Sequence, residues 1–218
     1  MERIMPIRLF VVATLLTSLV SFVAPAAAQE LRAIGDCTIR PGTLCPGADL
    51  RRADLHGADL SNAQFTNADL TGVRLDGARL RATNLQQAKL READLRNAVL
   101  EDADLRGALL RGADLSGADL SDANLRDAHL PNAKLKGAAL RNTDLTAAEL
   151  PGANLADADL RQAQLRGADL RGASLAGADL RGADLRSANL DGANLESAKI
   201  EGAQFLGASA QGCRGCPS

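Results

Sequence analysis

A strict period of five residues runs through most of this chain and limits what it can fold into. From Leu50 to Phe205 every fifth position is apolar, and 29 of these 32 positions are Leu. Two residues before each of them stands a second apolar column, which is Ala at 29 of its 32 positions. The phase does not slip across residues 48–207, so the sequence predicts one cooperative body without inserted loops or linkers.

This period fits neither a regular helix nor a straight strand. In an α-helix five residues turn through about 500°, so successive Leu side chains would spread over every face. In a strand the side chains alternate between two faces, so an odd repeat would send alternate Leu side chains to opposite sides. A chain that keeps both apolar columns inside must therefore turn a corner in every unit.

The column two residues after each Leu supplies residues suited to these corners. Of its 32 positions, 15 are Gly, five are Asn and four are Asp. These residues tolerate a positive φ in tight turns better than others do. The chain has no Trp, no Tyr and only four Phe, which favours a core of many similar thin layers over one globular interior.

The units resemble the pentapeptide-repeat family, whose motif is A(D/N)LXX, as in Ala53-Asp54-Leu55. The resemblance covers about three quarters of the chain. It implies an all-β fold, a right-handed quadrilateral β-helix with four pentapeptides per coil and about eight coils. Departures from the motif, such as Val73, Thr83 and Thr143 in the Ala column, leave its phase intact.

A coil of 20 residues also makes the outward side chains predictable, because residues 20 apart would stack. Pro131 would lie beside Pro151 on one face. Arg141, Arg161 and Arg181 would form a ladder on another. The Asp and Asn residues just before the Leu column are expected to make local hydrogen bonds at the corners.

Residues 1–28 have the pattern of a secretory signal peptide. Two Arg residues precede an apolar run over residues 9–23, and a small-residue pattern follows, so cleavage is expected between Ala28 and Gln29. An uncleaved membrane anchor is the alternative, which the shortness of the apolar run disfavours. We therefore expect an exported protein, periplasmic or extracellular, that is not attached to a membrane after cleavage.

The charge of the mature chain points to no particular partner. Removal of two Arg and one Glu with the signal peptide leaves 23 basic and 26 acidic residues. This near balance favours neither nucleic-acid binding nor an acidic tail. The partner that we expect is a protein, and the sequence does not identify it.

The sequence shows no convergent set of catalytic, cofactor-binding or metal-binding residues. The inward columns hold only apolar residues apart from Thr83 and Thr143, so no interior pocket is predicted. His56 and His129 are the only histidines and fall in outward columns. A solvated His is favoured at both positions over a metal ligand or a catalytic base. We expect a protein that is not an enzyme and has no cofactor.

Four cysteines flank the repeat: Cys37 and Cys45 precede it, and Cys213 and Cys216 follow it. In the implied rod these pairs lie at opposite ends, too far apart for one four-Cys zinc site. In an exported chain, local Cys37–Cys45 and Cys213–Cys216 disulfides are favoured over free thiols. A redox role for the C-terminal Cys-x-x-Cys is an alternative, although no thioredoxin-like pattern surrounds it.

Caps are expected at both ends, because the end coils of a solenoid expose an apolar cross-section that must be covered. Phe65 and Phe205 place the bulkiest interior side chains in the first and last coils. The predicted parts are a signal peptide, an N-terminal cap, the β-helix and a C-terminal cap, at residues 1–28, 29–47, 48–207 and 208–218.

The favoured function is an exported non-enzymatic scaffold that is structural or binds protein. A second hypothesis is a DNA-mimicking topoisomerase inhibitor, a function that some members of the family have. The export signal, the 23 basic residues among the acidic ones and the short C-terminal segment argue against it. A third hypothesis is a redox role at the C-terminal cysteines, and a fourth is a low-complexity duplication with little selected surface function.

Overall fold

The computed structural model describes residues 33–217, which begin with a short antiparallel hairpin. In it β1 (Ala33–Ile34) pairs with β2 (Cys37–Thr38). Ala33 lies opposite Thr38, and Ile34 lies opposite Cys37. Gly35, in the tight turn between the strands, has a positive φ of 58°, which Gly adopts without a steric penalty.

The predicted signal peptide and its cleavage point between Ala28 and Gln29 lie outside the described residues. Within residues 33–217, no helix is both long enough and apolar enough to cross a membrane.

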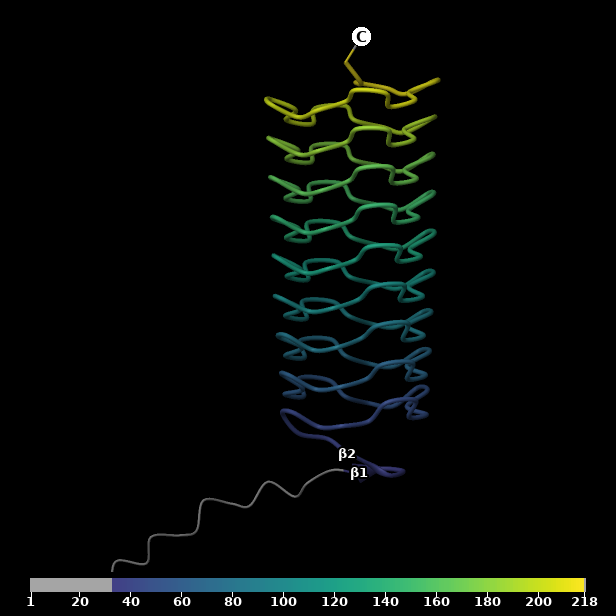
Figure 1. Cartoon of the computed structure of the whole chain (residues 1–218), viewed down its shortest axis with the longest axis vertical. Coiled ribbons are helices and arrows are strands. Elements are labelled where there is room, and N and C mark those ends of the chain that lie inside the picture. Colours follow the sequence, from purple (N-terminus) through teal and green to yellow (C-terminus); the bar gives the residue numbers. More distant parts are fainter. Residues whose placement is uncertain (1–32, 218) are drawn as a thin grey trace, which may run out of the picture. The chain divides into compact units, whose positions relative to one another are not determined.

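The remainder of the described chain winds as a stack of similar coils (Figure 1). Parallel β-bridges join each coil to the next at a constant offset of 20 residues, from Leu44 with Gln64 to Asn194 with Arg214. Four pentapeptides therefore make one coil. The predicted all-β solenoid and its register are confirmed, including the stacking of Pro131 beside Pro151, since Asn132 donates its N–H to the Pro151 carbonyl at 3.0 Å.

Units that are followed by another coil repeat one pattern of backbone hydrogen bonds. The N–H of Leu125 donates to the carbonyl of Asp144 in the next coil at 2.7 Å, and the N–H of Asp144 returns a bond to the carbonyl of Ala123 at 3.0 Å. Within the unit, the N–H of Ala128 donates to the carbonyl of Leu125 at 3.1 Å and closes the corner. Backbone polar groups are thus satisfied while the chain turns every five residues.

The corners lie where the sequence predicts them. All 32 residues of the column from Arg52 to Gly207 have a positive φ, between 52° and 73°. With the hydrogen bond that spans the corner, a positive φ at the third residue is the signature of a type II turn. Seventeen of these residues are not Gly, so the repeat holds many side chains in a backbone conformation that costs about 1–2 kcal/mol for an L-residue.

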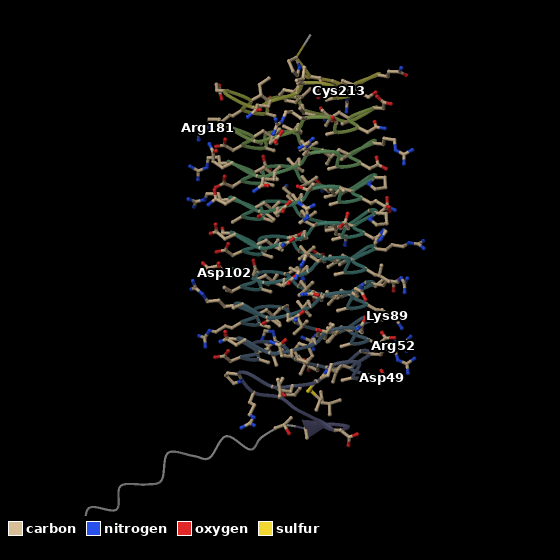
Figure 2. The ribbon with its side chains drawn as sticks, in the orientation of Figure 1. Asp49, Arg52, Lys89, Asp102, Arg181 and Cys213 are labelled. Carbon is tan, nitrogen blue, oxygen red and sulfur yellow. A yellow bond between two sulfur atoms is a disulfide. The ribbon has the colours of Figure 1, made fainter. Side chains whose placement is uncertain are left out.

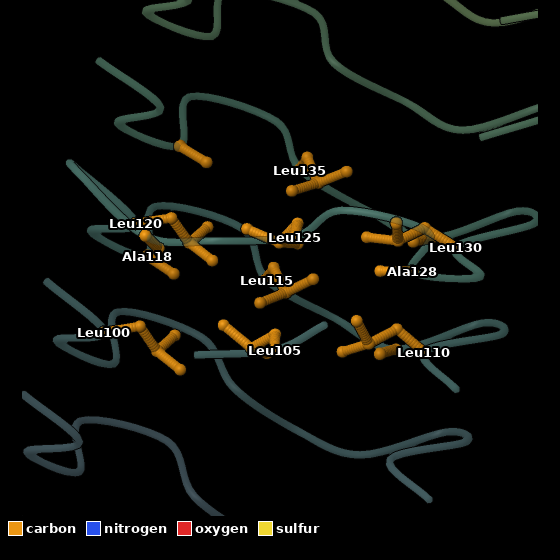
Figure 3. Close-up of a cluster of buried hydrophobic side chains, with 14 of the residues drawn as sticks. Leu100, Leu105, Leu110, Leu115, Ala118, Leu120, Leu125, Ala128, Leu130 and Leu135 are labelled. Atoms are coloured by element: carbon orange, nitrogen blue, oxygen red, sulfur yellow. The ribbon is translucent and has the colours of Figure 1, made fainter. Parts of the chain in front are cut away.

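The Leu and Ala columns fill the interior of the coils (Figure 3). From Leu50 to Leu195, every residue of the Leu column is at most 1% exposed. Thr83 and Thr143 are fully buried in the Ala column. The core is therefore a stack of nearly identical layers, as the low aromatic content predicts.

The coil geometry extends beyond the predicted limits of 48–207. Its bridges begin at Leu44 and end at Arg214, so parts of both predicted caps belong to the solenoid. At the N-terminal end, Cys37 and Cys45 pack onto the core and are 2% and 5% exposed. Cys45 is in phase with the Leu column, so an imperfect first unit over residues 43–47 is readable from the sequence, whereas Ala210 in place of Leu hides the extension at the C-terminal end.

Candidate functional surface

The charged side chains project outward from the coils (Figure 2). Seven units contain the triplet Asp-Leu-Arg, and all seven form the same ion pair. In each, the Arg Nε donates to one carboxylate oxygen of the Asp at 2.7–2.9 Å, and Nη2 donates to the other at 2.6–2.7 Å. The pairs are Asp49–Arg51, Asp94–Arg96, Asp104–Arg106, Asp159–Arg161, Asp169–Arg171, Asp179–Arg181 and Asp184–Arg186.

These pairs hold the carboxylates in their charged form. Hydrogen bonds from the Arg181 side chain lower the pKa of Asp179 to about 2. The Arg51 side chain lowers the pKa of Asp49 to about 2 in the same way. Each pair cancels its own charge, so the faces carry many charged groups and little net field. Their contribution to stability is small because the Arg side chains are largely solvent-exposed, although most of the Asp side chains are partly buried.

The Asp residues also support the corners, as predicted. The carboxylate of Asp59 accepts the backbone N–H of Ser61 at 3.1 Å and its hydroxyl at 2.8 Å. Asp114 and Ser116 form the same pair of bonds at 3.1 Å and 2.7 Å. These local bonds satisfy corner amides, which explains the frequency of Asp before the Leu column.

One predicted ladder spans three coils. Arg161 and Arg181 pair with Asp159 and Asp179 in their own units at 2.7 Å and 2.6 Å. Arg141, whose unit has Ala at the corresponding position, reaches instead to Asp159 in the next coil at 3.0 Å. In these ion pairs three guanidinium groups share two carboxylates.

Both histidines lie on the outside and bind a carboxylate one coil away. The Nδ1 atom of His56 lies 2.7 Å from Asp76 Oδ2, and that of His129 lies 2.9 Å from Glu149 Oε2. Neither histidine joins a group of side chains able to hold a metal ion, and no such group of three or more exists within residues 33–217.

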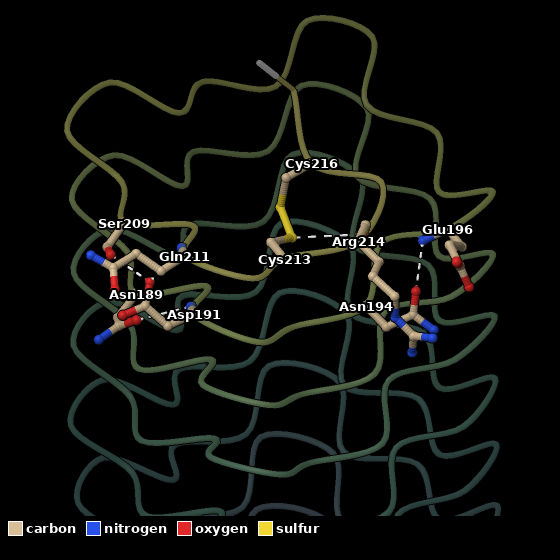
Figure 4. The surroundings of a disulfide bond; sticks show 9 residues. All are labelled: Asn189, Asp191, Asn194, Glu196, Ser209, Gln211, Cys213, Arg214 and Cys216. Carbon is tan, nitrogen blue, oxygen red and sulfur yellow. Dashed lines mark hydrogen bonds between the residues drawn. A yellow bond between two sulfur atoms is a disulfide. The ribbon is translucent and has the colours of Figure 1, made fainter.

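The cysteines form two local pairs at the two ends of the stack. Cys37 bonds to Cys45, with Cα atoms 5.5 Å apart, and Cys213 bonds to Cys216, with Cα atoms 5.8 Å apart. The first pair is buried, whereas the second is partly exposed beside the last coil (Figure 4). Because the two pairs lie at opposite ends of the stack, they cannot share a metal ion.

The C-terminal end differs from the N-terminal end in how well its core is covered. Phe65, near the N-terminal end, is 1% exposed, but Ile200 and Phe205 in the last coil are only partly buried. Leu206 is 80% exposed. A surface hollow of about 490 Å³ lies here, and it is lined by Leu190, Phe205, Leu206, Ala208, Ala210, Cys216 and Pro217.

Comparison with known proteins now places the chain in a family. The family model for pentapeptide repeats matches it in eight copies, over residues 42–72, 74–112, 108–146, 138–177, 148–186 and 178–214. The chain is a pentapeptide-repeat protein. The family is scaffold-like, and none of the solved structures described below is named as an enzyme. No curated protein matches the chain significantly.

Solved pentapeptide-repeat structures resemble this one. HetL from the cyanobacterium Nostoc sp. strain PCC 7120, which is involved in heterocyst differentiation regulation, is 36% identical with a TM-score of 0.50; the match covers 78% of this chain and 88% of HetL. QnrB1, a plasmid-mediated fluoroquinolone resistance protein, is 20% identical over the same shares, with a TM-score of 0.47. A thylakoid-lumen protein of Arabidopsis thaliana is 34% identical over 45% of this chain and 65% of its own, with a TM-score of 0.37. The family match and the likeness to HetL support the right-handed quadrilateral β-helix that is predicted for this pentapeptide-repeat protein.

Two surface features were not predicted from the sequence. The recurrent Asp-Leu-Arg triplet could have predicted the ion pairs. The repeated corner geometry holds the Asp and Arg side chains of each triplet at the same distance. The poorly covered C-terminal end had a weaker signal. Leu206 occupies an outward position at which four earlier coils have an arginine, namely Arg106, Arg126, Arg166 and Arg186.

Proposed function

We propose that this pentapeptide-repeat protein is an exported, non-enzymatic scaffold and that its C-terminal end binds a second copy of the same chain. The observation that carries this proposal is the partly exposed core of the last coil. Ile200 and Phe205 lie at the end of an otherwise closed stack, with Leu206 exposed beside them. Burial of such apolar surface is the main favourable contribution to protein association.

The backbone of the last coil also offers hydrogen bonds to a partner. Elsewhere in the stack, amides of the Leu column donate to the next coil. Those of Ile200 and Phe205, and that of Gly202 at the corner between them, donate no backbone hydrogen bond within residues 33–217. A polypeptide edge laid on this coil would satisfy them, as in β-strand addition.

The charges around this end suit a second copy. The outward side chains of the last coil include two acids, Glu196 and Glu201, and two bases, Lys199 and Arg214. Their charges sum to zero, so two such ends do not repel each other, and opposite charges can pair across a two-fold axis.

Export and the lack of an enzyme activity are part of the same proposal. The signal-peptide pattern of residues 1–28 supports export. The interior columns, which hold apolar side chains and two hydrogen-bonded Thr residues, offer no reactive group and so support a scaffold. A DNA-mimicking role fits poorly, because seven surface Asp residues are each neutralised by an Arg.

Sedimentation velocity of the mature chain over a range of concentrations tests the C-terminal end. We expect a dimer whose dissociation constant rises at least about tenfold in Leu206→Asp, because a carboxylate would be buried against apolar surface. Leu44→Asp is the matched control, since Leu44 is 76% exposed at the opposite end, and it should leave the dimer unchanged. A monomer at every concentration, or a dimer weakened by the control alone, would contradict the assignment.

A further inference from the structure

Two arginines on one face of the solenoid lack the Asp within their own unit that pairs with each of the seven Asp-Leu-Arg arginines. Arg126 and Arg166 occupy the same position in their units as the seven Arg residues of the Asp-Leu-Arg triplets. Their units carry Asn124 and Gln164 where those units carry Asp. Arg166 forms no hydrogen bond through its side chain and no ion pair with any residue among 33–217.

These two arginines lie on either side of a short side chain. Arg126, Thr146, Arg166 and Arg186 follow one another on four successive coils, each 20 residues apart. The spacing between neighbouring coils is about 4.8 Å. Because Thr146 is short, the face is hollowed between the flanking Arg side chains. The hollow measures about 570 Å³ and is lined by Arg126, Thr146, Gln164, Arg166, Gly167, Asp184, Arg186 and Ser187.

The hollow is positively charged although the chain as a whole is acidic. Arg186 is held by Asp184 through bonds of 2.8 Å and 2.6 Å. Arg126 makes only a long contact of 3.4 Å with Asp144 in the next coil. Three guanidinium groups thus face two carboxylates.

The field of Arg166 reaches into the hollow. The pKa of Asp184 is lowered first by hydrogen bonds from Arg186 and also by the positive charge of Arg166. A second anion placed beside Arg166 would meet a guanidinium group without a carboxylate partner, and Arg126 is held only by its 3.4 Å contact with Asp144. Arg166 therefore differs from the seven arginines that are each paired with the Asp of their own unit.

We propose that this hollow binds the phosphate group of a small phosphorylated sugar. Guanidinium groups hold phosphate through paired, charge-assisted hydrogen bonds. The hydroxyl of Thr146 can donate a further bond from below. The amide of Gln164 and the hydroxyl of Ser187 give the walls polar groups that suit sugar hydroxyls better than an apolar ligand. The volume lies within the range typical of small-molecule sites.

Isothermal titration calorimetry distinguishes the possible sources of the phosphate. The probes are glucose 6-phosphate, inorganic phosphate and glucose, each titrated into the mature chain at an ionic strength of about 0.15 M, where distant surface charges are screened. We expect glucose 6-phosphate to bind more tightly than inorganic phosphate, and glucose not to bind. Equal affinity for the two phosphates would overturn the sugar part of the proposal.

One substitution tests the site without removing an arginine. Gln164→Asp gives Arg166 the same carboxylate partner that seven other units have, so it should neutralise the donors while preserving the fold. We expect glucose 6-phosphate affinity to fall at least about tenfold, the effect of losing a charge-assisted hydrogen bond. Arg166→Gln should have a similar effect, and Asp184→Asn, which releases Arg186, should increase affinity.

Arg171→Gln is the matched control, because Arg171 occupies the equivalent position on another face and is paired with Asp169 at 2.6 Å. It should leave binding unchanged. No binding of either phosphate by the unaltered chain would overturn the proposal. Unchanged binding in both Gln164→Asp and Arg166→Gln, or equal loss in Arg171→Gln, would also overturn it.

Discussion

The hydroxyl of Thr83 donates a hydrogen bond to the carbonyl oxygen of Leu60, 2.9 Å away, inside the solenoid. Thr143 repeats this contact with the carbonyl of Leu120 at 2.8 Å, three coils further along. Both Thr residues are fully buried. A buried hydroxyl is tolerated in the Ala column because the coil one step back offers an acceptor at the right place.

Removal of this hydroxyl should weaken the fold modestly. We expect Thr83→Ala to lower the free energy of unfolding by about 1 kcal/mol, the usual net value of one hydrogen bond. Thr143→Ala should act equally, and the two effects should add because the sites share no contact. Urea unfolding measures all three variants. A double variant that loses much more than the sum would show that the two sites are coupled.

The cost of truncating the Leu column should depend on position along the rod. Leu125 is fully buried in the middle, so Leu125→Ala should lower the free energy of unfolding by about 2–5 kcal/mol. Ile200 is partly exposed in the last coil, so Ile200→Ala should cost less than half as much. The same urea experiment compares them at a protein concentration low enough to keep the chain monomeric, and equal losses there would contradict the partial exposure of Ile200.

The corners allow a test in both directions. Gly137 has a φ of 66° and open space around its missing Cβ, so Gly137→Ala should destabilise the fold by about 1 kcal/mol through backbone strain alone. Ala147 sits at the same position of another unit with a φ of 57°. Ala147→Gly should therefore stabilise it by a similar amount, as read from the thermal midpoint. A fall in midpoint for Ala147→Gly would contradict the account of the corners.

Acid should weaken the protein over a defined range of pH. The ordinary pKa of Asp is 3.8, and Arg181 lowers that of Asp179 to about 2 in the folded chain. A lowered folded pKa adds stability above the unfolded value, and this stability is lost as pH falls through the folded value. We expect the urea midpoint to be flat above about pH 5 and to fall between about pH 4 and pH 2. Asp179→Asn should show a smaller fall, and an identical fall would assign the effect to other groups.

The interior of this protein was predictable because the Leu and Ala columns recur in every unit. A column of Leu at a period of five admits only a chain that turns regularly, and the bridges of Asp144 with Gln164 and of Asn124 with Asp144 show the resulting register. The outside was less predictable, since each surface contact depends on several neighbouring columns. Arg141 reaches to the next coil because its own unit carries Ala139.

The ends were the least predictable parts, because the repeat no longer dictates them. Arg214 still pairs with Asn194, beyond the limit that periodicity placed at residue 207. Phe205 falls in phase with the Leu column, yet it is only partly buried, because the described residues that follow it cover the last coil incompletely. Only a three-dimensional arrangement shows which layer lacks a neighbour.

The central claim, an exported solenoid scaffold closed by disulfides, is tested most directly by mass spectrometry of the protein from fractionated cells. One measurement reads the N-terminal residue and counts free thiols. The account predicts a chain that begins at Gln29 in the exported fraction and has no free thiol among Cys37, Cys45, Cys213 and Cys216. A chain that begins at Met1 in the cytosol with four free thiols would contradict it.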